Sequence, residues 1–148
     1  MTGVQTCAPP ISAINIVNGW WREEFETYGA GWIEDEAARY RRMGEYLDVM
    51  LGMMGDKPFS HAGEFYRVNE AASWLKPVQR PHPPLYAGGR HDGSQNVIAK
   101  SCDAWFVDTL TNFRDWEQNV ERVRGLVADM NARAARHGRT LKIGRAHV

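Results

Sequence analysis

The chain has 148 residues, 43% of them hydrophobic and 11% aromatic, which is enough to bury one core. Basic and acidic residues number 18 each, so no net charge draws it to nucleic acid or to an anionic membrane. No apolar run approaches the ~20 residues that span a bilayer, and no secretory leader is evident, so we expect a cytoplasmic protein. Cys7 and Cys102 show neither a CxxC spacing nor a matching histidine cluster, which argues against a zinc site and a disulfide framework.

The two ends of the chain follow neither helix nor strand patterns. The segments TGVQTCAPPIS and IGRAHV look like translations of a sequencing-library adapter, read inward from each end. We therefore expect residues 1–12 and 143–148 to be adapter-derived tails, and we exclude them from the interpretation of the fold. Residues 13–142 are expected to form the folded part.

The first half of the folded part contains a strand, a helix and a hairpin. A short apolar run predicts a buried strand at residues 14–17. A helix is predicted over residues 36–54, because apolar side chains recur there every three or four positions. Residues 58–68 are typical of a β-hairpin that turns at Gly63.

The second half alternates strands and helices. Apolar runs predict strands at residues 85–87, 104–107 and 141–143. A short helix is predicted at residues 94–101, and a long one at residues 112–137 that ends before Gly138. This alternation predicts an α/β fold with a parallel sheet, and a partial (β/α)₈ barrel, roughly strands 4 to 7 with outer helices and a hairpin insertion, fits it best.

Five segments carry a resemblance to a known family. They are NIVNGWWREEFETYG, ARYRRMGEYLDV, PFSHAGEFYRV, KPVQRPHPPLYAGG and CDAWF. In order and spacing they resemble the bacterial luciferase-like flavin monooxygenases, most closely the branch of dimethylsulfone and alkanesulfonate monooxygenases. The resemblance covers about residues 13 to 142.

The resemblance implies an enzyme that takes reduced FMN from a partner flavin reductase and uses O₂ to oxidise a small organosulfur compound. It also implies a homo-oligomer for the complete protein. Four strands leave two sheet edges without a neighbour, so the chain by itself is expected to be inactive.

The resemblance also assigns residues to the cofactor. It implies that Asn15 and Glu24 face the flavin and that Arg39 and Tyr40 hold its ribityl phosphate. The residue type agrees for Arg39, whose guanidinium offers a fork of donors near a helix N-terminus. Asn15 could instead satisfy backbone groups at the rim, and Glu24 could be a solvated charge.

Trp20 and Trp21 follow the first strand, where a tryptophan could stack on the flavin or line the substrate pocket. Packing against a neighbouring loop is the more common role, and we favour it for one of the two.

Gly88 and Gly89 predict a second phosphate contact, because glycines between a strand and a helix leave backbone N–H groups accessible to an anion. Relatives usually carry a serine one residue after this pair, where this chain has His91, preceded by Arg90. Arg90 could compensate with its charge, or Ser94 with its hydroxyl. No carboxylate is placed in the sequence to orient His91 as a base or metal ligand, so no metal site is predicted.

Asp108 is a second departure, because relatives often place an aromatic or amide residue there and a carboxylate is unfavourable beside a reduced, anionic flavin. Three interpretations stay open. The first is the FMN-dependent monooxygenase. The second is another luciferase-like oxidoreductase, including one that uses the deazaflavin F420 and oxygenases of the nitrilotriacetate or pyrimidine-ring-opening type. The third is no enzyme, either a flavin-binding remnant without catalysis or a fragment that cannot fold and has no activity.

Overall fold

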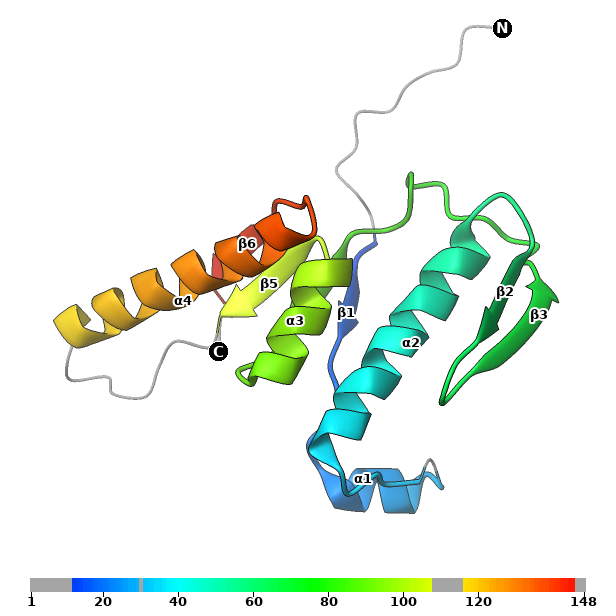
Figure 1. Cartoon of the computed structure of the whole chain (residues 1–148), viewed down its shortest axis with the longest axis horizontal. Coiled ribbons are helices and arrows are strands. Elements are labelled where there is room, and N and C mark those ends of the chain that lie inside the picture. The colour runs from blue at the N-terminus through cyan, green and yellow to red at the C-terminus, as the bar shows by residue number, and fades with distance from the viewer. Residues whose placement is uncertain (1–11, 30, 108–115, 146–148) are drawn as a thin grey trace, which may run out of the picture.

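The computed structural model describes residues 12–29, 31–107 and 116–145 (Figure 1). The elements in chain order are β1 (Ile14–Ile16), α1 (Arg22–Thr27), α2 (Glu36–Met54), β2 (Phe59–Ala62), β3 (Arg67–Ala71), β4 (Leu85–Gly88), α3 (Asp92–Ser101), β5 (Ala104–Val107), α4 (Trp116–Arg136) and β6 (Lys142–Arg145).

Four strands form one sheet in the order β1-β4-β5-β6, and every neighbouring pair is parallel. One row across the sheet is Ile16, Ala87, Trp105 and Ile143. The predicted parallel sheet is confirmed. β2 and β3 form a separate antiparallel hairpin, also as predicted, and its turn is closed by a hydrogen bond from the Gly63 N–H to the Tyr66 carbonyl.

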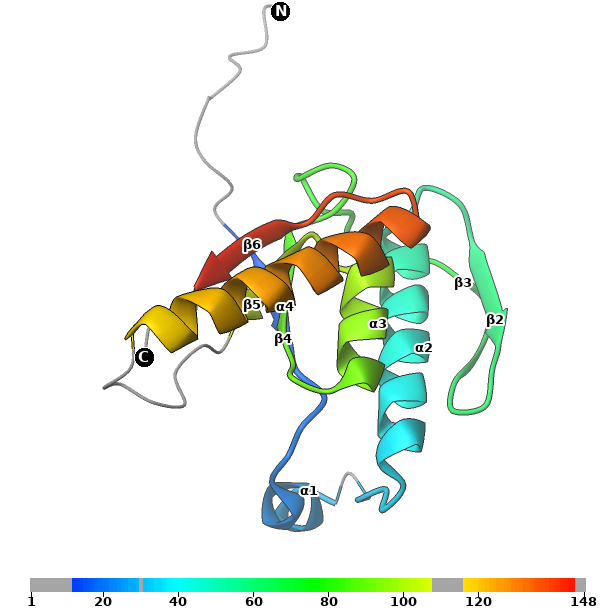
Figure 2. The same ribbon diagram turned by 60° about the vertical axis from the view of Figure 1, so that its left-hand side comes forward.

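The three long helices form a layer on one face of the sheet. Helix α3 lies between α2 and α4, and the β2–β3 hairpin packs on the side of α2 that is remote from α3 (Figures 1 and 2). Among the described residues, no helix covers the other face. A parallel sheet with helices outside and strands in sequential order is the wall of a (β/α)₈ barrel.

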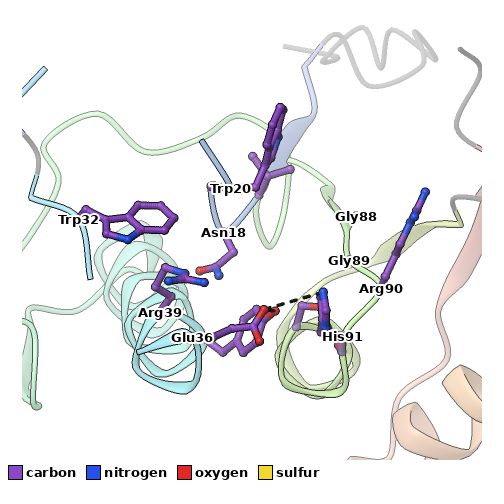
Figure 3. A pocket seen from close by; sticks show the side chains of 13 residues that line it. Asn18, Trp20, Trp32, Glu36, Arg39, Gly88, Gly89, Arg90 and His91 are labelled. Atoms are coloured by element: carbon purple, nitrogen blue, oxygen red, sulfur yellow. Dashed lines mark hydrogen bonds and ion pairs between the residues drawn. The ribbon is translucent and has the colours of Figure 1, made fainter. Parts of the chain in front are cut away.

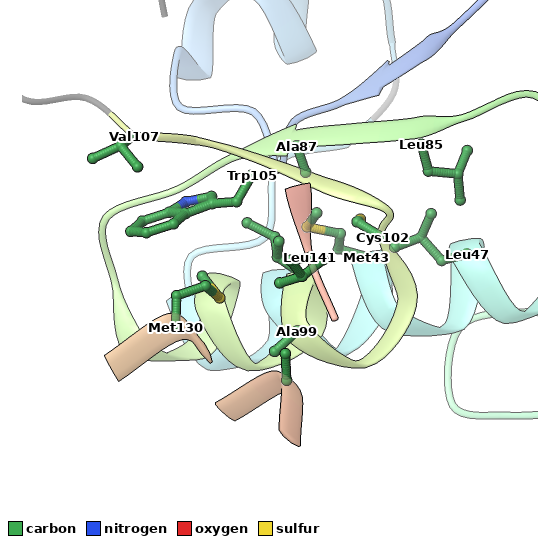
Figure 4. Packing of buried hydrophobic residues seen from close by; sticks show 12 residues of the cluster. Met43, Leu47, Leu85, Ala87, Ala99, Cys102, Trp105, Val107, Met130 and Leu141 are labelled. Atoms are coloured by element: carbon green, nitrogen blue, oxygen red, sulfur yellow. The ribbon is translucent and has the colours of Figure 1, made fainter. Parts of the chain in front are cut away.

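The core lies between the sheet and the helices. Leu85 of β4 and Trp105 of β5 meet Leu47 of α2, Ile98 of α3 and Met130 of α4, and all five are at most 2% exposed (Figure 4). Since side chains alternate along a strand, the residues between them face away from the helices. There Tyr86 and Phe106 stack with ring centres 5.2 Å apart on the face that no described helix covers.

Local interactions fix both ends of α2 and the C-terminal end of α4. The Asp35 carboxylate accepts a hydrogen bond of 3.0 Å from the Ala37 N–H, which caps the start of α2. The Lys76 ammonium donates to the carbonyls of Met53 and Gly55 at its end. Gly138, with φ +65°, terminates α4 in the left-handed conformation that favours glycine.

The observed boundaries differ from the predicted ones in a few places. β1 ends at Ile16, α3 begins at Asp92, and β6 runs from Lys142 to Arg145, so residues 143–145 of the expected tail pair with β5. Helix α1 was not predicted, because its six residues contain only one apolar side chain, Phe25. The predicted start of the last long helix and Asp108 lie outside the described residues.

Helix α4 is buried unevenly along its length. Trp116 at its start is 66% exposed, whereas Met130 and Ala134 near its end are buried. No helix within the described ranges combines the length and apolar character required to cross a membrane.

Candidate functional site

A pocket of about 610 Å³ opens at the carboxyl ends of β1 and β4, between the N-termini of α2 and α3 (Figure 3). This is the end of a (β/α)₈ barrel at which ligands bind. Its volume lies within the range of small-molecule and cofactor sites. The lining residues are Val17, Asn18, Gly19, Trp20, Trp32, Glu36, Arg39, Tyr40, Gly88, Gly89, Arg90, His91 and Ser94.

The pocket unites six of the eight residues predicted to bind the cofactor, namely Arg39, Tyr40, Gly88, Gly89, Arg90 and His91. Asn15 instead lines a neighbouring hollow of about 460 Å³, which shares Val17 and Asn18 with the pocket. Glu24 lies exposed on α1 and lines neither hollow. Asn15 therefore does not share a single hollow with Arg39 and the glycine pair.

Arg39 forms one wall of the pocket together with Trp32. Its Nη1 donates to the carbonyls of Ile33 at 2.6 Å and Glu34 at 3.1 Å, and its guanidinium carbon lies 4.4 Å from the centre of the Trp32 ring. These contacts order the segment that enters α2. The Nε atom is buried and has no hydrogen-bond acceptor among the described residues, so Arg39 keeps an unsatisfied donor at the pocket.

The glycine pair has two different surroundings. A Cβ atom on Gly89 would lie 2.4 Å from the Ser94 hydroxyl, so a side chain there would displace Ser94 from the turn between β4 and α3. A Cβ atom on Gly88 would make one ordinary contact, at 3.9 Å from the Phe106 carbonyl oxygen, so the strand end is not crowded there. The Ser94 hydroxyl donates to the His91 carbonyl at 2.7 Å and is thus already engaged in the first turn of α3.

A carboxylate faces His91 across the pocket, contrary to the expectation from the sequence. Glu36 Oε1 lies 3.8 Å from His91 Nε2 and accepts a hydrogen bond of 2.7 Å from the Tyr40 hydroxyl (Figure 3). Burial and this hydrogen bond raise the pKa of Tyr40 to about 12, so the phenol stays neutral and donates. We call Glu36, Tyr40 and His91 the carboxylate cluster.

The two tryptophans of the strand exit are both accessible. Trp20 lines the pocket and is 84% exposed, and its ring stacks on that of Trp21 at 6.5 Å. Trp32, which was not predicted as a site residue, is half-buried, and its ring is held edge-on by Phe25 at 5.4 Å. The aromatic surface of the pocket therefore comes from two segments, one on each side of α1.

Residues 13–146 match the family model described as luciferase-like monooxygenase. The chain belongs to this family. One relative is the FMNH₂-dependent dimethylsulfone monooxygenase of Pseudomonas putida, which is 34% identical over 132 residues. The match takes 89% of this chain and 34% of the relative, so the chain spans about a third of the length of that protein.

Solved structures confirm the fold of this luciferase-like chain as part of a (β/α)₈ barrel. Long-chain alkane monooxygenase (LadA) superposes with a TM-score of 0.76 at 19% identity, over 90% of this chain and 35% of that one. DmoA from Hyphomicrobium sulfonivorans superposes with a TM-score of 0.72, also at 19% identity, over 90% of this chain and 32% of that one.

Trp32 and Glu36 line the pocket, but neither was predicted as a site residue from the sequence. Glu36 was visible as the first residue of a predicted helix, but nothing in the sequence indicated that it would face His91. Within the described residues, no three His, Cys, Asp or Glu side chains lie close enough to hold a metal ion.

Proposed function

We propose that this chain is the part of a reduced-FMN-dependent monooxygenase that binds the phosphate end of the flavin, and that the whole enzyme oxidises a small organosulfur compound with O₂. The observation that carries the proposal is the 34% identity over 89% of the chain to a relative named as an FMNH₂-dependent dimethylsulfone monooxygenase. Reduced FMN, when bound, would supply the two electrons that let one oxygen atom of O₂ enter the substrate while the other leaves as water.

The residues of the pocket fit a flavin phosphate. Arg39 has a buried Nε without an acceptor among the described residues, and Gly88 has no side chain to keep a ligand from the backbone. The first turn of α3 adds N–H groups that lack intrahelical partners and the positive end of a helix dipole. Arg90 and His91 contribute further positive or ionisable groups.

The aromatic side chains fit the other end of the ligand. Trp20 and Trp32 offer flat surfaces against which an isoalloxazine ring could be held, since aromatic rings stack on one another with a modest energetic gain. We therefore propose that the flavin phosphate lies at the N-terminus of α3 and that the isoalloxazine ring lies toward the two tryptophans. Asn15 and Glu24 remain proposed flavin contacts that would require the ligand to extend beyond the pocket.

The experiment uses a closed barrel, in which residues 13–145 replace the matched segment of the Pseudomonas putida enzyme. This barrel supplies neighbours for both edges of the sheet. Binding of FMN, riboflavin and F420 is measured by fluorescence, and consumption of dimethylsulfone is followed with FMNH₂ and O₂. We expect FMN to bind and dimethylsulfone to be consumed only with FMNH₂. Selective F420 binding would favour the deazaflavin interpretation, and FMN binding without turnover of any sulfone would favour the remnant.

Two arginine variants test the assigned pocket. Arg39→Met should weaken FMN binding by about tenfold or more, the usual effect of losing a hydrogen bond to a charged group. Arg124→Met is the matched control, since Arg124 is exposed on α4 and pairs only with the neighbouring Glu121 in the described structure. Equal affinities in the two variants would contradict the placement of the phosphate.

A further inference from the structure

A carboxylate at the phosphate end of the pocket is the least expected feature of this site. Glu36 is the first residue of α2, and its side chain extends toward the first turn of α3, where His91 is the N-cap residue (Figure 3). His91 makes no capping hydrogen bond to its own helix. Its Nε2 instead lies 3.8 Å from Glu36 Oε1. The carboxylate thus lies beside the N-cap residue of α3, at the helix terminus where the phosphate is proposed to bind.

Tyr40 fixes the position of this carboxylate. Its hydroxyl donates to Glu36 at 2.7 Å, one turn along the same helix, and its ring packs so closely on Gly93 that a Cβ atom there would lie 2.1 Å from Cδ2. Because Gly93 is in the first turn of α3, this contact joins the two helix N-termini. Glu36 is therefore held in place by the packing of the pocket wall.

Two charged side chains near the carboxylate cluster, Asp92 and Arg39, make contacts with groups other than Glu36. Asp92 is directed to Arg133 of α4, with 2.6 Å between carboxylate and guanidinium. Arg39 uses Nη1 for backbone carbonyls, and Arg90 extends away from Glu36 (Figure 3). A phosphate bound at the α3 N-terminus would lie near Glu36, and like charges a few ångströms apart repel.

We propose that Glu36 keeps the flavin exchangeable: its carboxylate engages His91 and repels the flavin phosphate, so that the pocket binds FMN weakly enough to release it after each turnover. This inference rests on the proposed function. A flavin that is reduced by one protein and consumed by another must leave its site in every cycle, and tight phosphate binding would slow that step. Glu36 does not take part in the reaction. It positions His91, and its negative charge makes a ligand with a phosphate bind less tightly than one without.

The test separates the phosphate from the rest of the flavin. Dissociation constants for FMN and riboflavin are measured in the closed barrel at pH 8 and low salt, and their ratio reports the contribution of the phosphate alone. Glu36→Gln keeps the shape of the side chain and an acceptor for Tyr40. It should raise the preference for FMN over riboflavin by about threefold to tenfold, the range expected for removing one like charge near the surface. Glu117→Gln, the same change in the first turn of α4, should leave the ratio unchanged.

A second variant tests the role of His91. Adding His91→Gln to Glu36→Gln should reduce the gain without abolishing it, because the imidazole that Glu36 releases is then missing while the negative charge stays removed. An unchanged or reduced preference for FMN in Glu36→Gln would overturn the inference while leaving the proposed function intact. A gain of the same size in the double variant as in Glu36→Gln would overturn the part assigned to His91. A folded closed barrel that binds neither flavin would reject the proposed function and the inference together.

Discussion

The contact between Gly93 and Tyr40 makes a prediction that depends on packing alone. A Cβ atom on Gly93 would lie 2.1 Å from Cδ2 and 2.8 Å from two further atoms of the Tyr40 ring. Ordinary carbon contacts begin near 3.4 Å, so in Gly93→Ala the ring would have to retreat by about 1 Å or more. The ring is held by its hydroxyl bond to Glu36, so this movement also disturbs the carboxylate cluster.

Two effects of opposite sign determine how much Gly93→Ala changes the free energy of unfolding. Alanine in place of glycine inside a helix stabilises by about 0.5–1 kcal/mol, because it restricts the unfolded chain. Inserting a methyl group into a filled space costs about 1–3 kcal/mol. For Gly93→Ala the second effect dominates, and we expect the free energy of unfolding to fall by about 1–2 kcal/mol.

Gly125 provides the matched control, because it also lies inside a helix but has nothing within 4 Å of the position that a Cβ atom would take. Gly125→Ala should therefore stabilise by about 0.5–1 kcal/mol. Both variants are compared in the closed barrel by urea unfolding, followed by tryptophan fluorescence. If Gly93→Ala proves as stabilising as Gly125→Ala, the close approach of α2 and α3 at Tyr40 is refuted.

Three further predictions concern other parts of the chain. Burial would raise the pKa of Glu45, but hydrogen bonds from the hairpin backbone lower this pKa below its ordinary 4.5. The ionised carboxylate therefore stabilises the fold above pH 4.5, and this stabilisation is lost as the pH falls through the lowered pKa. Glu45→Gln should flatten the acid side of the profile of unfolding free energy against pH, between about pH 6 and pH 3. Burial raises the pKa of the Cys102 thiol to about 12, so iodoacetamide at pH 8 should label Cys102 only after unfolding, and labelling of the native protein, detected by peptide mass spectrometry, would contradict the buried position. Lys76→Met removes the ammonium that caps the end of α2 and should lower the free energy of unfolding by about 1 kcal/mol, whereas the same change at Lys57, which is exposed, should have little effect.

Local patterns in the sequence determined most of the secondary structure. The apolar repeat over residues 36–54 and Asp35 before it specify α2 to the residue, because periodicity and capping act within one or two turns of helix. The hairpin around Gly63 and the short apolar strands are of the same kind. Helix α1 was missed for the same reason, since a six-residue helix with one apolar side chain has no period to detect.

The sequence also indicated six of the residues that line the pocket. Arg39, Tyr40 and the residues after β4 could be placed together, because the carboxyl ends of parallel strands and the helix starts that follow them meet at one rim. Asn15 follows the same rule only in part, since it lines the neighbouring hollow.

Only the tertiary structure decided the electrostatics of the pocket. Glu36 and His91 lie on different helices, and their 3.8 Å separation depends on how closely α2 approaches α3. That approach is set by Gly93, whose missing side chain admits the Tyr40 ring. Sequence patterns report which face of a helix is apolar, but the distance between two helices follows from the packing of side chains that are remote in the chain. The charge that opposes a phosphate in this pocket is therefore a property of the folded chain.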